Sequence, residues 1–289
     1  MPPYDISAID TVVNPHTPDI LKIRPDWGAK FYKEKFGRDD SVVKGYTYEK
    51  MIELMDAAGI GHAFLVANKT GQLGTPGSWH LPYEVVAEAV QSHPGRFFGL
   101  AGIDPTEGMD GVRALEKAVK EYGFVGAHLY PHWFELAPDH AKYYPFYAKC
   151  VELDIPIQMQ VGQSLIYYDK RPLRSVGRPI TLDAVACDFP ELKLLGIHIG
   201  IPWADEMIAM AWKHPNVHIV ADAHLPKYWP KAFVNYINTY GQDKVLFGTD
   251  FPVIEFDRFR DEVENLNLRP DPKRKFLREN AIRVYKLPL

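Results

Sequence analysis

Two side chains that can carry protons stand at the ends of apolar segments in the second half of the chain. His198 lies within the run Leu194–Gly200, and Asp250 directly follows Phe247–Thr249. An imidazole and a carboxylate that meet in one cavity can supply a general base and the group that orients it. A buried carboxylate also needs a cation, a metal or hydrogen-bond donors as its partner. We therefore predict that His198 and Asp250 carry the chemistry of this protein.

Other polar side chains stand at comparable positions, and we predict that they bind substrate: Asn14, His128, Tyr130, Gln160 and Asp222. Gln158 and Gln160 share one face of their segment, because side chains alternate along a strand. An unpaired buried polar group costs about 1–3 kcal/mol, so two glutamines in an apolar run need partners. We interpret Gln158 as part of a polar layer in the core and Gln160, nearer the end of its segment, as a site residue.

Eight strand candidates can position these residues. Most are continuous apolar runs, typical of parallel strands that are buried on both faces. The candidates are Tyr4–Val13, Gly61–Ala67, Phe97–Ile103, Val125–Tyr130, Ile155–Val161, Leu192–Ile199, Val217–Ala221 and Val245–Thr249. Helical patterns lie between them, which indicates βαβ units. Eight such units predict a single-domain (β/α)8 TIM barrel over residues 1–289.

A doubly wound open sheet is the alternative fold. Such sheets often carry a glycine-rich turn after the first strand. Here the residues in that place are Asn14–Thr17, which contain no glycine. In a barrel, functional side chains gather at the carboxyl ends of the strands, where the candidates named above stand.

Residues 15–46 are too long for a simple connection between a strand and a helix. We predict an inserted helical segment after the first strand. It carries four aromatic residues among charged ones: Trp27, Phe31, Tyr32 and Phe36. The segment can cover the barrel mouth or form a surface hairpin without substrate contact, and the sequence leaves both interpretations open.

The composition excludes several classes of protein. The chain has 33 Lys and Arg against 37 Asp and Glu, whereas nucleic-acid-binding proteins usually show a basic patch. No run approaches 18 apolar residues, so we expect no membrane span. Cys150 and Cys187 form no C-x-x-C pair and suit a reducing cytoplasm, where we expect the protein. The expected partner is therefore a small-molecule substrate.

Four segments in a fixed order give the chain a resemblance to the amidohydrolase superfamily, running from Ile9 to Leu287. They are His93–Leu100, Leu192–Gly200, Gly248–Pro252 and Asn280–Tyr285. The chain is most similar to the amidohydrolase-2 branch, which holds aminocarboxymuconate-semialdehyde decarboxylase and γ-resorcylate decarboxylase. The resemblance implies a (β/α)8 barrel, a zinc or manganese ion, a homodimer or larger assembly, and C–C bond cleavage or hydrolysis. It also implies that His198 is an acid–base group and Asp250 a metal ligand.

The metal ligands that the resemblance implies are only partly present. The first-strand motif of the branch, H-x-H or E-x-H, is replaced by Val12 and Asn14, and the fifth-strand histidine by Gln160. Zinc prefers imidazole, thiolate and carboxylate ligands, and neutral amides suit harder cations better. We therefore expect the metal site to be lost or greatly weakened. The alternative is a relocated site formed by His128, His198 and Asp250.

These observations predict an enzyme of the amidohydrolase-2 type that decarboxylates or hydrolyses a small aromatic or ring-derived carboxylate, with His198 as acid and base. Retro-Claisen hydrolysis of a β-ketoacyl compound is an alternative, because it also places negative charge on an enolate. A further alternative is a barrel that lost its metal site and only binds a ligand. The sequence does not choose among these activities.

Overall fold

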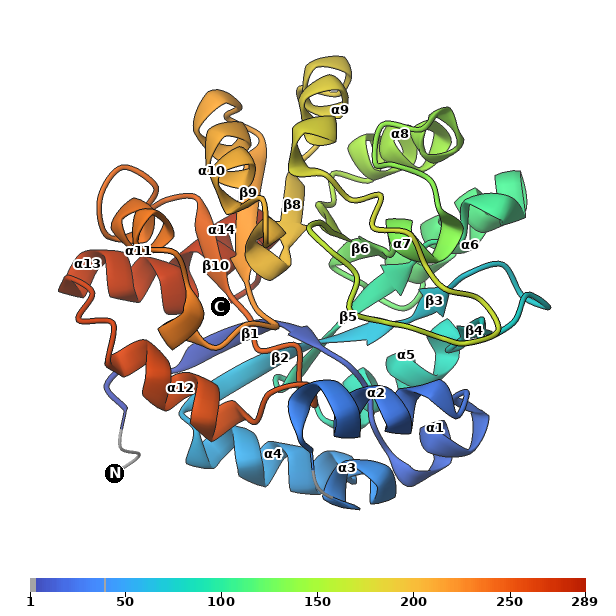
Figure 1. The fold of residues 1–289 in the computed structure, drawn as a ribbon, viewed down its shortest axis with the longest axis horizontal. Coiled ribbons are helices and arrows are strands. Elements are labelled where there is room, and N and C mark those ends of the chain that lie inside the picture. Colours follow the sequence, from blue (N-terminus) through green and yellow to red (C-terminus); the bar gives the residue numbers. More distant parts are fainter. Residues whose placement is uncertain (1–3, 39) are drawn as a thin grey trace.

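Eight parallel strands form the centre of the molecule. The computed structural model describes residues 4–38 and 40–289. The strands form one sheet in the order β1-β2-β5-β6-β7-β8-β9-β10, and the sheet curls into a nearly closed barrel (Figure 1). A bridge between Val13 and Phe251 brings the first strand beside the segment after the last one. The bounds are β1 Ala8–Val13, β2 Ile60–Ala67, β5 Phe97–Gly102, β6 Gly126–Leu129, β7 Ile157–Gln160, β8 Leu194–Ile197, β9 Val217–Ala221 and β10 Val245–Phe247.

All eight predicted strands are present, so the predicted (β/α)8 fold is confirmed, with differences at the strand ends. β1 begins at Ala8 rather than Tyr4, and β8 ends at Ile197, so that His198 lies just beyond its strand. Two short strands outside the barrel, β3 (Lys69–Thr70) and β4 (Trp79–His80), pair antiparallel. We did not predict them, because two residues are too few for an alternating pattern to show.

Helices surround the barrel (Figure 1). Those that connect strands are α4 Tyr48–Ala57, α5 Tyr83–Ser92, α6 Gly108–Lys120, α7 Pro131–Phe134, α8 Tyr144–Glu152, α9 Leu182–Asp188, α10 Ala204–Lys213 and α11 Lys231–Asn238, whereas α12 Phe256–Glu264, α13 Pro270–Arg274 and α14 Asn280–Tyr285 follow the last strand. The sequence did not predict α7 and α12. In the part of the chain that the structure describes, none of the helices is long and apolar enough to cross a membrane.

The helix α4 shows why these segments are helical. Thr47 accepts the backbone N–H of Lys50 at its start, and Met51 and Met55 are buried against the barrel. Gly59 follows with a φ of 66°, which a glycine adopts at little cost.

The end of the barrel at which the strands begin is closed by α14. Tyr285 lies against Gly126, the first residue of β6, and its ring packs edge-on to Phe64 inside the barrel. The Tyr285 hydroxyl donates to Oε1 of Gln158 at 2.8 Å, and the Gln158 amide donates to the carbonyl of Thr11. Gln158 therefore belongs to a satisfied polar layer in the core, as predicted.

The inserted segment after β1 forms α1 (Pro18–Ile23), α2 (Trp27–Phe36) and α3 (Asp40–Lys44). Residue 39, within the predicted range 15–46, and residues 1–3 of the predicted domain lie outside the described residues. Trp27 and Tyr32 are buried and line the cavity at the carboxyl ends of the strands, together with Phe31 and Phe36. The segment therefore lies over the barrel mouth rather than forming a hairpin confined to the surface.

Candidate active site

A cavity opens at the carboxyl ends of the barrel strands. The space between its walls, including the part open to solvent, is about 740 Å³. Polar side chains reach it from six strands, each standing at or after the end of its strand: Asn14, Asn68, Tyr130, Gln160, His198 and Asp250. The cavity is thus where the sequence predicted the chemistry to lie.

His198 is held by Asp222, which follows β9. Nδ1 of His198 lies 3.0 Å from Oδ2 of Asp222, and the backbone N–H of His198 donates to Oδ1 of the same carboxylate at 2.5 Å. Asp222 is fully buried, and His198 is 8% exposed. A carboxylate beside Nδ1 keeps the proton on that nitrogen and fixes the ring. Nε2 is therefore the ring nitrogen of His198 that Asp222 leaves free for other contacts.

Gln160 faces Nε2 of His198. Its amide nitrogen lies 2.9 Å from Nε2 of His198, so it donates to the neutral ring. Oε1 of Gln160 is buried and has no hydrogen-bond partner. Rotation of the amide by half a turn presents this oxygen to a protonated Nε2. Gln160 can therefore form a hydrogen bond with both the neutral and the protonated ring of His198.

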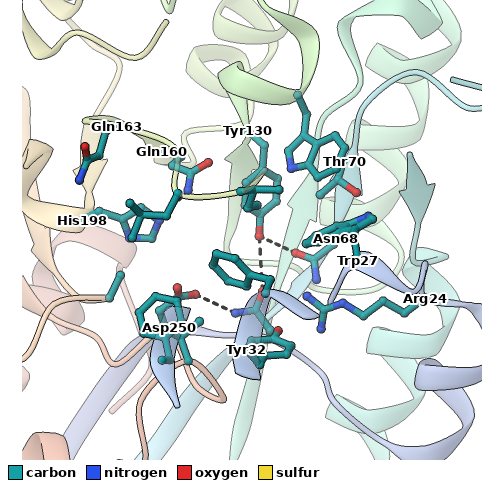
Figure 2. A pocket seen from close by; sticks show the side chains of 18 of the residues that line it. Arg24, Trp27, Tyr32, Asn68, Thr70, Tyr130, Gln160, Gln163, His198 and Asp250 are labelled. Carbon is teal, nitrogen blue, oxygen red and sulfur yellow. Dashed lines mark hydrogen bonds between the residues drawn. The ribbon is translucent and has the colours of Figure 1, made fainter. Parts of the chain in front are cut away.

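A chain of polar contacts runs from Asp250 through Asn14 and Tyr130 to Asn68 (Figure 2). Nδ2 of Asn14 donates to Oδ1 of Asp250 at 2.8 Å. The Tyr130 hydroxyl lies 2.6 Å from Oδ1 of Asn68 and 3.5 Å from Oδ1 of Asn14, and the longer distance marks a weak contact. The chain orients both amides before any substrate arrives, as preorganised polar sites require.

Three residues that line the cavity have a left-handed backbone, which side chains other than glycine rarely adopt. They are His198 (φ 65°), Ala223 (φ 59°) and Asp250 (φ 59°). Such strained residues cluster at functional sites and depend on support from their surroundings. Asp10 supports Asp250, because it accepts the N–H and the hydroxyl of the preceding Thr249 at 3.0 and 2.6 Å.

Arg24 lies across the cavity from His198 (Figure 2). Among the described residues that line the cavity, it alone carries a permanent positive charge. Its guanidinium lies 5.2–5.8 Å from the ring centroids of Trp27, Tyr32 and Trp79. Its Nε is buried and has no hydrogen-bond partner. A guanidinium between aromatic rings at a cavity wall is suited to bind an anionic oxygen on a planar molecule.

The pKa values of Asp250 and His198 are both raised above their usual values. The pKa of Asp250 rises to about 7, because burial outweighs the opposing effect of His198, and the Asp222 charge adds to the rise. Burial lowers the pKa of His198, but the charges of Asp222 and Asp250 outweigh it, so the pKa of His198 is raised. Asp250 therefore exchanges its proton near neutral pH, as acid–base groups in enzymes do.

The predicted site residues divide into two groups. Those that line the cavity are Asn14, Tyr130, Gln160, His198 and Asp250. Asp222 and His128 are fully buried outside its lining. Nδ1 of His128 lies 2.9 Å from the amide of Gln158, and burial lowers the pKa of His128 to about 3. The substrate contacts that we expected for Asp222 and His128 are therefore replaced by contacts within the protein.

Part of the cavity comes from residues that the sequence analysis did not single out: Arg24, Asn68, Thr70, Trp79 and Trp133. Thr70 and Trp79 belong to the β3–β4 hairpin, and Arg24 lies between α1 and α2. Polar residues of loops follow no periodic pattern, so only the aromatic residues of the insertion gave a signal.

The sequence also matches the profile of a known family, Amidohydro_2, described as amidohydrolase, over residues 42–287. The chain belongs to the amidohydrolase family. Among curated relatives, γ-resorcylate decarboxylase of Polaromonas sp. is 26% identical over 243 residues, which span 71% of this chain and 74% of the relative. The resemblance seen in the sequence is thus confirmed.

Solved structures share the barrel. An uncharacterised TIM-barrel protein of Bordetella bronchiseptica superposes with a TM-score of 0.79 at 26% identity, covering 96% of this chain and 98% of that protein. A 5-carboxyvanillate decarboxylase of Novosphingobium aromaticivorans, bound to manganese and 3-methoxy-4-hydroxy-5-nitrobenzoic acid, has a TM-score of 0.72 at 18% identity and covers 98% of each chain. At this identity the second likeness concerns the fold alone.

The side chains of this amidohydrolase do not fit the metal of that relative. Asn14 directs its amide N–H, not an oxygen, at Asp250, and Val12 is an apolar side chain. Across residues 4–38 and 40–289, no three His, Cys, Asp or Glu ligand atoms at this cavity lie within 4.8 Å of one another. The alternative set of His128, His198 and Asp250 therefore does not converge either.

Proposed function

We propose that this amidohydrolase decarboxylates a small aromatic carboxylate and does so without a metal ion. The observation that carries the proposal is the His198–Asp222 pair facing Arg24 across an aromatic-walled cavity. Planar rings pack well between aromatic side chains. The γ-resorcylate decarboxylase among the relatives acts on a substrate of this class.

His198 supplies the proton in this reaction. The ring carbon that bears the carboxylate gains a proton, the C–C bond breaks, its electron pair returns to the ring, and CO2 leaves. Nε2 is the donor atom, because Asp222 holds Nδ1. Solvent then returns a proton to Nε2. A positioned acid of this kind contributes typically 10²–10⁴-fold to a rate, as an order of magnitude.

Arg24 binds the other side of the substrate. Because the proton arrives at the His198 end, the leaving carboxylate lies there, and Arg24 across the cavity binds a different oxygen of the ring (Figure 2). A ring hydroxyl beside a guanidinium is stabilised as its phenolate. The phenolate releases electron density into the ring and so favours protonation of carbon. In this proposal the phenolate, and not a metal ion, activates the ring carbon for protonation.

Asp250 lies beside the leaving carboxylate in this arrangement. Its charge raises the pKa of His198 and so keeps the acid protonated. When Asp250 is ionised it also repels the substrate carboxylate, and the loss of neutral CO2 relieves this repulsion. The amide N–H of Asn14 donates to Oδ1 of Asp250 at 2.8 Å and holds the Asp250 side chain in place.

The experiment is a CO2-release assay on protein dialysed against EDTA, with 2,6-dihydroxybenzoate and other hydroxybenzoates as substrates. The wild type is expected to release CO2 and the corresponding phenol. His198→Asn is expected to lose about 100-fold or more of this rate, whereas the exposed His140→Asn is expected to retain it.

Four results would overturn the proposal. Activity that returns only with added manganese or zinc would refute the metal-free step. Equal rates for His198→Asn and the wild type would refute the role of His198. Binding of aromatic acids without turnover, or cleavage of β-ketoacyl compounds instead, would support the alternatives of a binding barrel or a retro-Claisen hydrolase.

A further inference from the structure

Three side chains of different chemistry meet on the outer wall of the barrel, between α9 and α10. Asp183 and Cys187 stand one turn apart on α9, and His214 follows the end of α10. Residues four apart lie on the same face of a helix. One ligand atom from each of the three side chains lies within 4.8 Å of the other two.

We propose that Asp183, Cys187 and His214 bind a zinc ion, with water as the fourth ligand. Carboxylate, thiolate and imidazole are the ligand types that zinc prefers, whereas calcium and magnesium take oxygen ligands. Tetrahedral zinc with bonds of about 2.0–2.3 Å holds its ligands roughly 3.3–3.8 Å apart. All three ligand atoms already lie within 4.8 Å of one another, and binding requires Nε2 of His214 and Oδ1 of Asp183, now 2.6 Å apart, to separate slightly.

The cluster combines an ordered ligand with an accessible one. His214 is 7% exposed, and its Nε2 lies 2.6 Å from Oδ1 of Asp183, which fixes the ring. The Cys187 side chain is exposed, so an ion can enter from solvent. Binding displaces the proton of the thiol and the proton of the ligating imidazole nitrogen, and both protons pass to solvent.

Lys213 competes with the ion for Asp183. Its Nζ lies 2.6 Å from the same Oδ1 atom, and its side chain is 55% exposed. The ammonium can therefore swing into water when a dication takes its place. Removal of the Lys213 charge is therefore expected to tighten metal binding. If the Lys213–Asp183 ion pair only stabilised the fold, its removal would not increase the affinity for a metal.

The position of the proposed zinc site, between α9 and α10, indicates that a bound ion stabilises the fold. The helix α9 precedes β8 and α10 follows it, and His198 stands just after β8. An ion that joins the two helices stabilises this unit of the barrel from the outside. It takes no part in the chemistry at the cavity, which is why its test does not depend on the proposed function.

The test is a titration of the metal-free protein with Co²⁺, followed by the thiolate-to-cobalt absorption band and displacement by Zn²⁺. The wild type is expected to show the band at one equivalent per chain. Cys187→Ser is expected to lose the band, His214→Gln to weaken binding, and Lys213→Gln to tighten it. Cys150→Ala, which removes the buried second cysteine, serves as the control that keeps the band.

A band that persists in Cys187→Ser, or no binding in either the wild type or Lys213→Gln, would overturn the assignment. A second cluster, His80, Asp104 and Glu107, also brings three ligand atoms together, but it contains no thiol, and Lys69 lies 2.5 Å from Glu107. Cobalt bound without a thiolate band and lost in His80→Gln would therefore place the ion there and refute the Cys187 site.

Discussion

Asp222 holds His198 at two points. Oδ1 accepts the backbone N–H of His198 at 2.5 Å, and Oδ2 lies 3.0 Å from its Nδ1. Both contacts go to one fully buried carboxylate, so the left-handed turn at His198 and the proton on its ring depend on the same group. In the proposed reaction, Asp222 therefore acts through His198 as a positioning residue.

We expect Asp222→Asn to lower kcat by about 10²–10⁴-fold while KM changes little. The amide removes the charge that stabilises the imidazolium, so the pKa of His198 falls and the limb of the pH–rate profile that reports it moves to lower pH. Steady-state kinetics across pH and an NMR titration of the histidines measure both effects. A lower kcat with an unmoved pH profile would mean that Asp222 supports only the backbone.

The strands and five polar residues of the cavity could be predicted from the sequence, whereas the pairings between them could not. Buried parallel strands are continuous apolar runs, and a barrel gathers whatever polar residues follow them. The contact of Asp222 with His198 depends on the register of β8 against β9, in which Leu195 faces His218. No local pattern encodes that register.

Arg24 was missed for a related reason. It lies in the insertion, and its place in the cavity depends on how α2 and the β3–β4 hairpin pack around it. Its guanidinium contacts Trp27 of α2 and Trp79 of the β3–β4 hairpin. A lone arginine in a charged segment is indistinguishable from a solvated one until those contacts are known.

We expect Arg24→Met to raise KM for hydroxybenzoates by about 10–100-fold, which corresponds to the loss of a hydrogen bond to a charged group, about 1.5–3 kcal/mol. Methionine keeps much of the apolar contact with Trp27 and Tyr32 while removing the charge. Initial-rate kinetics give the change, and the exposed Arg174→Met is the control. The same loss of affinity for benzoate, which has no ring hydroxyl, would contradict the proposed contact.

The buried Asp10 is expected to make stability depend on pH. Burial raises its pKa to about 8, while an unfolded aspartate titrates near 3.9. The folded state thus keeps a proton that the unfolded state releases, so this contribution to stability is complete below about pH 4 and is lost as the pH rises toward 8. In Asp10→Asn this dependence should be smaller, by up to about 1.4 kcal/mol per pH unit.

Urea unfolding of the wild type and Asp10→Asn at pH 5, 6, 7 and 8 measures this difference. Asp139→Asn, at an exposed carboxyl group, is the control and should follow the wild type. Parallel curves for wild type and Asp10→Asn would mean that Asp10 is ionised in the folded protein.

The hydroxyl of Tyr285 is expected to stabilise the barrel through a single contact. It donates to Oε1 of Gln158 at 2.8 Å, where both side chains are buried in the core. Tyr285→Phe leaves that oxygen without a donor, which costs about 1–3 kcal/mol of the free energy of unfolding. Chemical denaturation measures the loss, and Tyr228→Phe, at a side chain that is 70% exposed, should change stability little. Because this contact lies at the opposite end of the barrel from His198, KM should stay unchanged, and a large rise in KM would show that the polar layer also shapes the cavity.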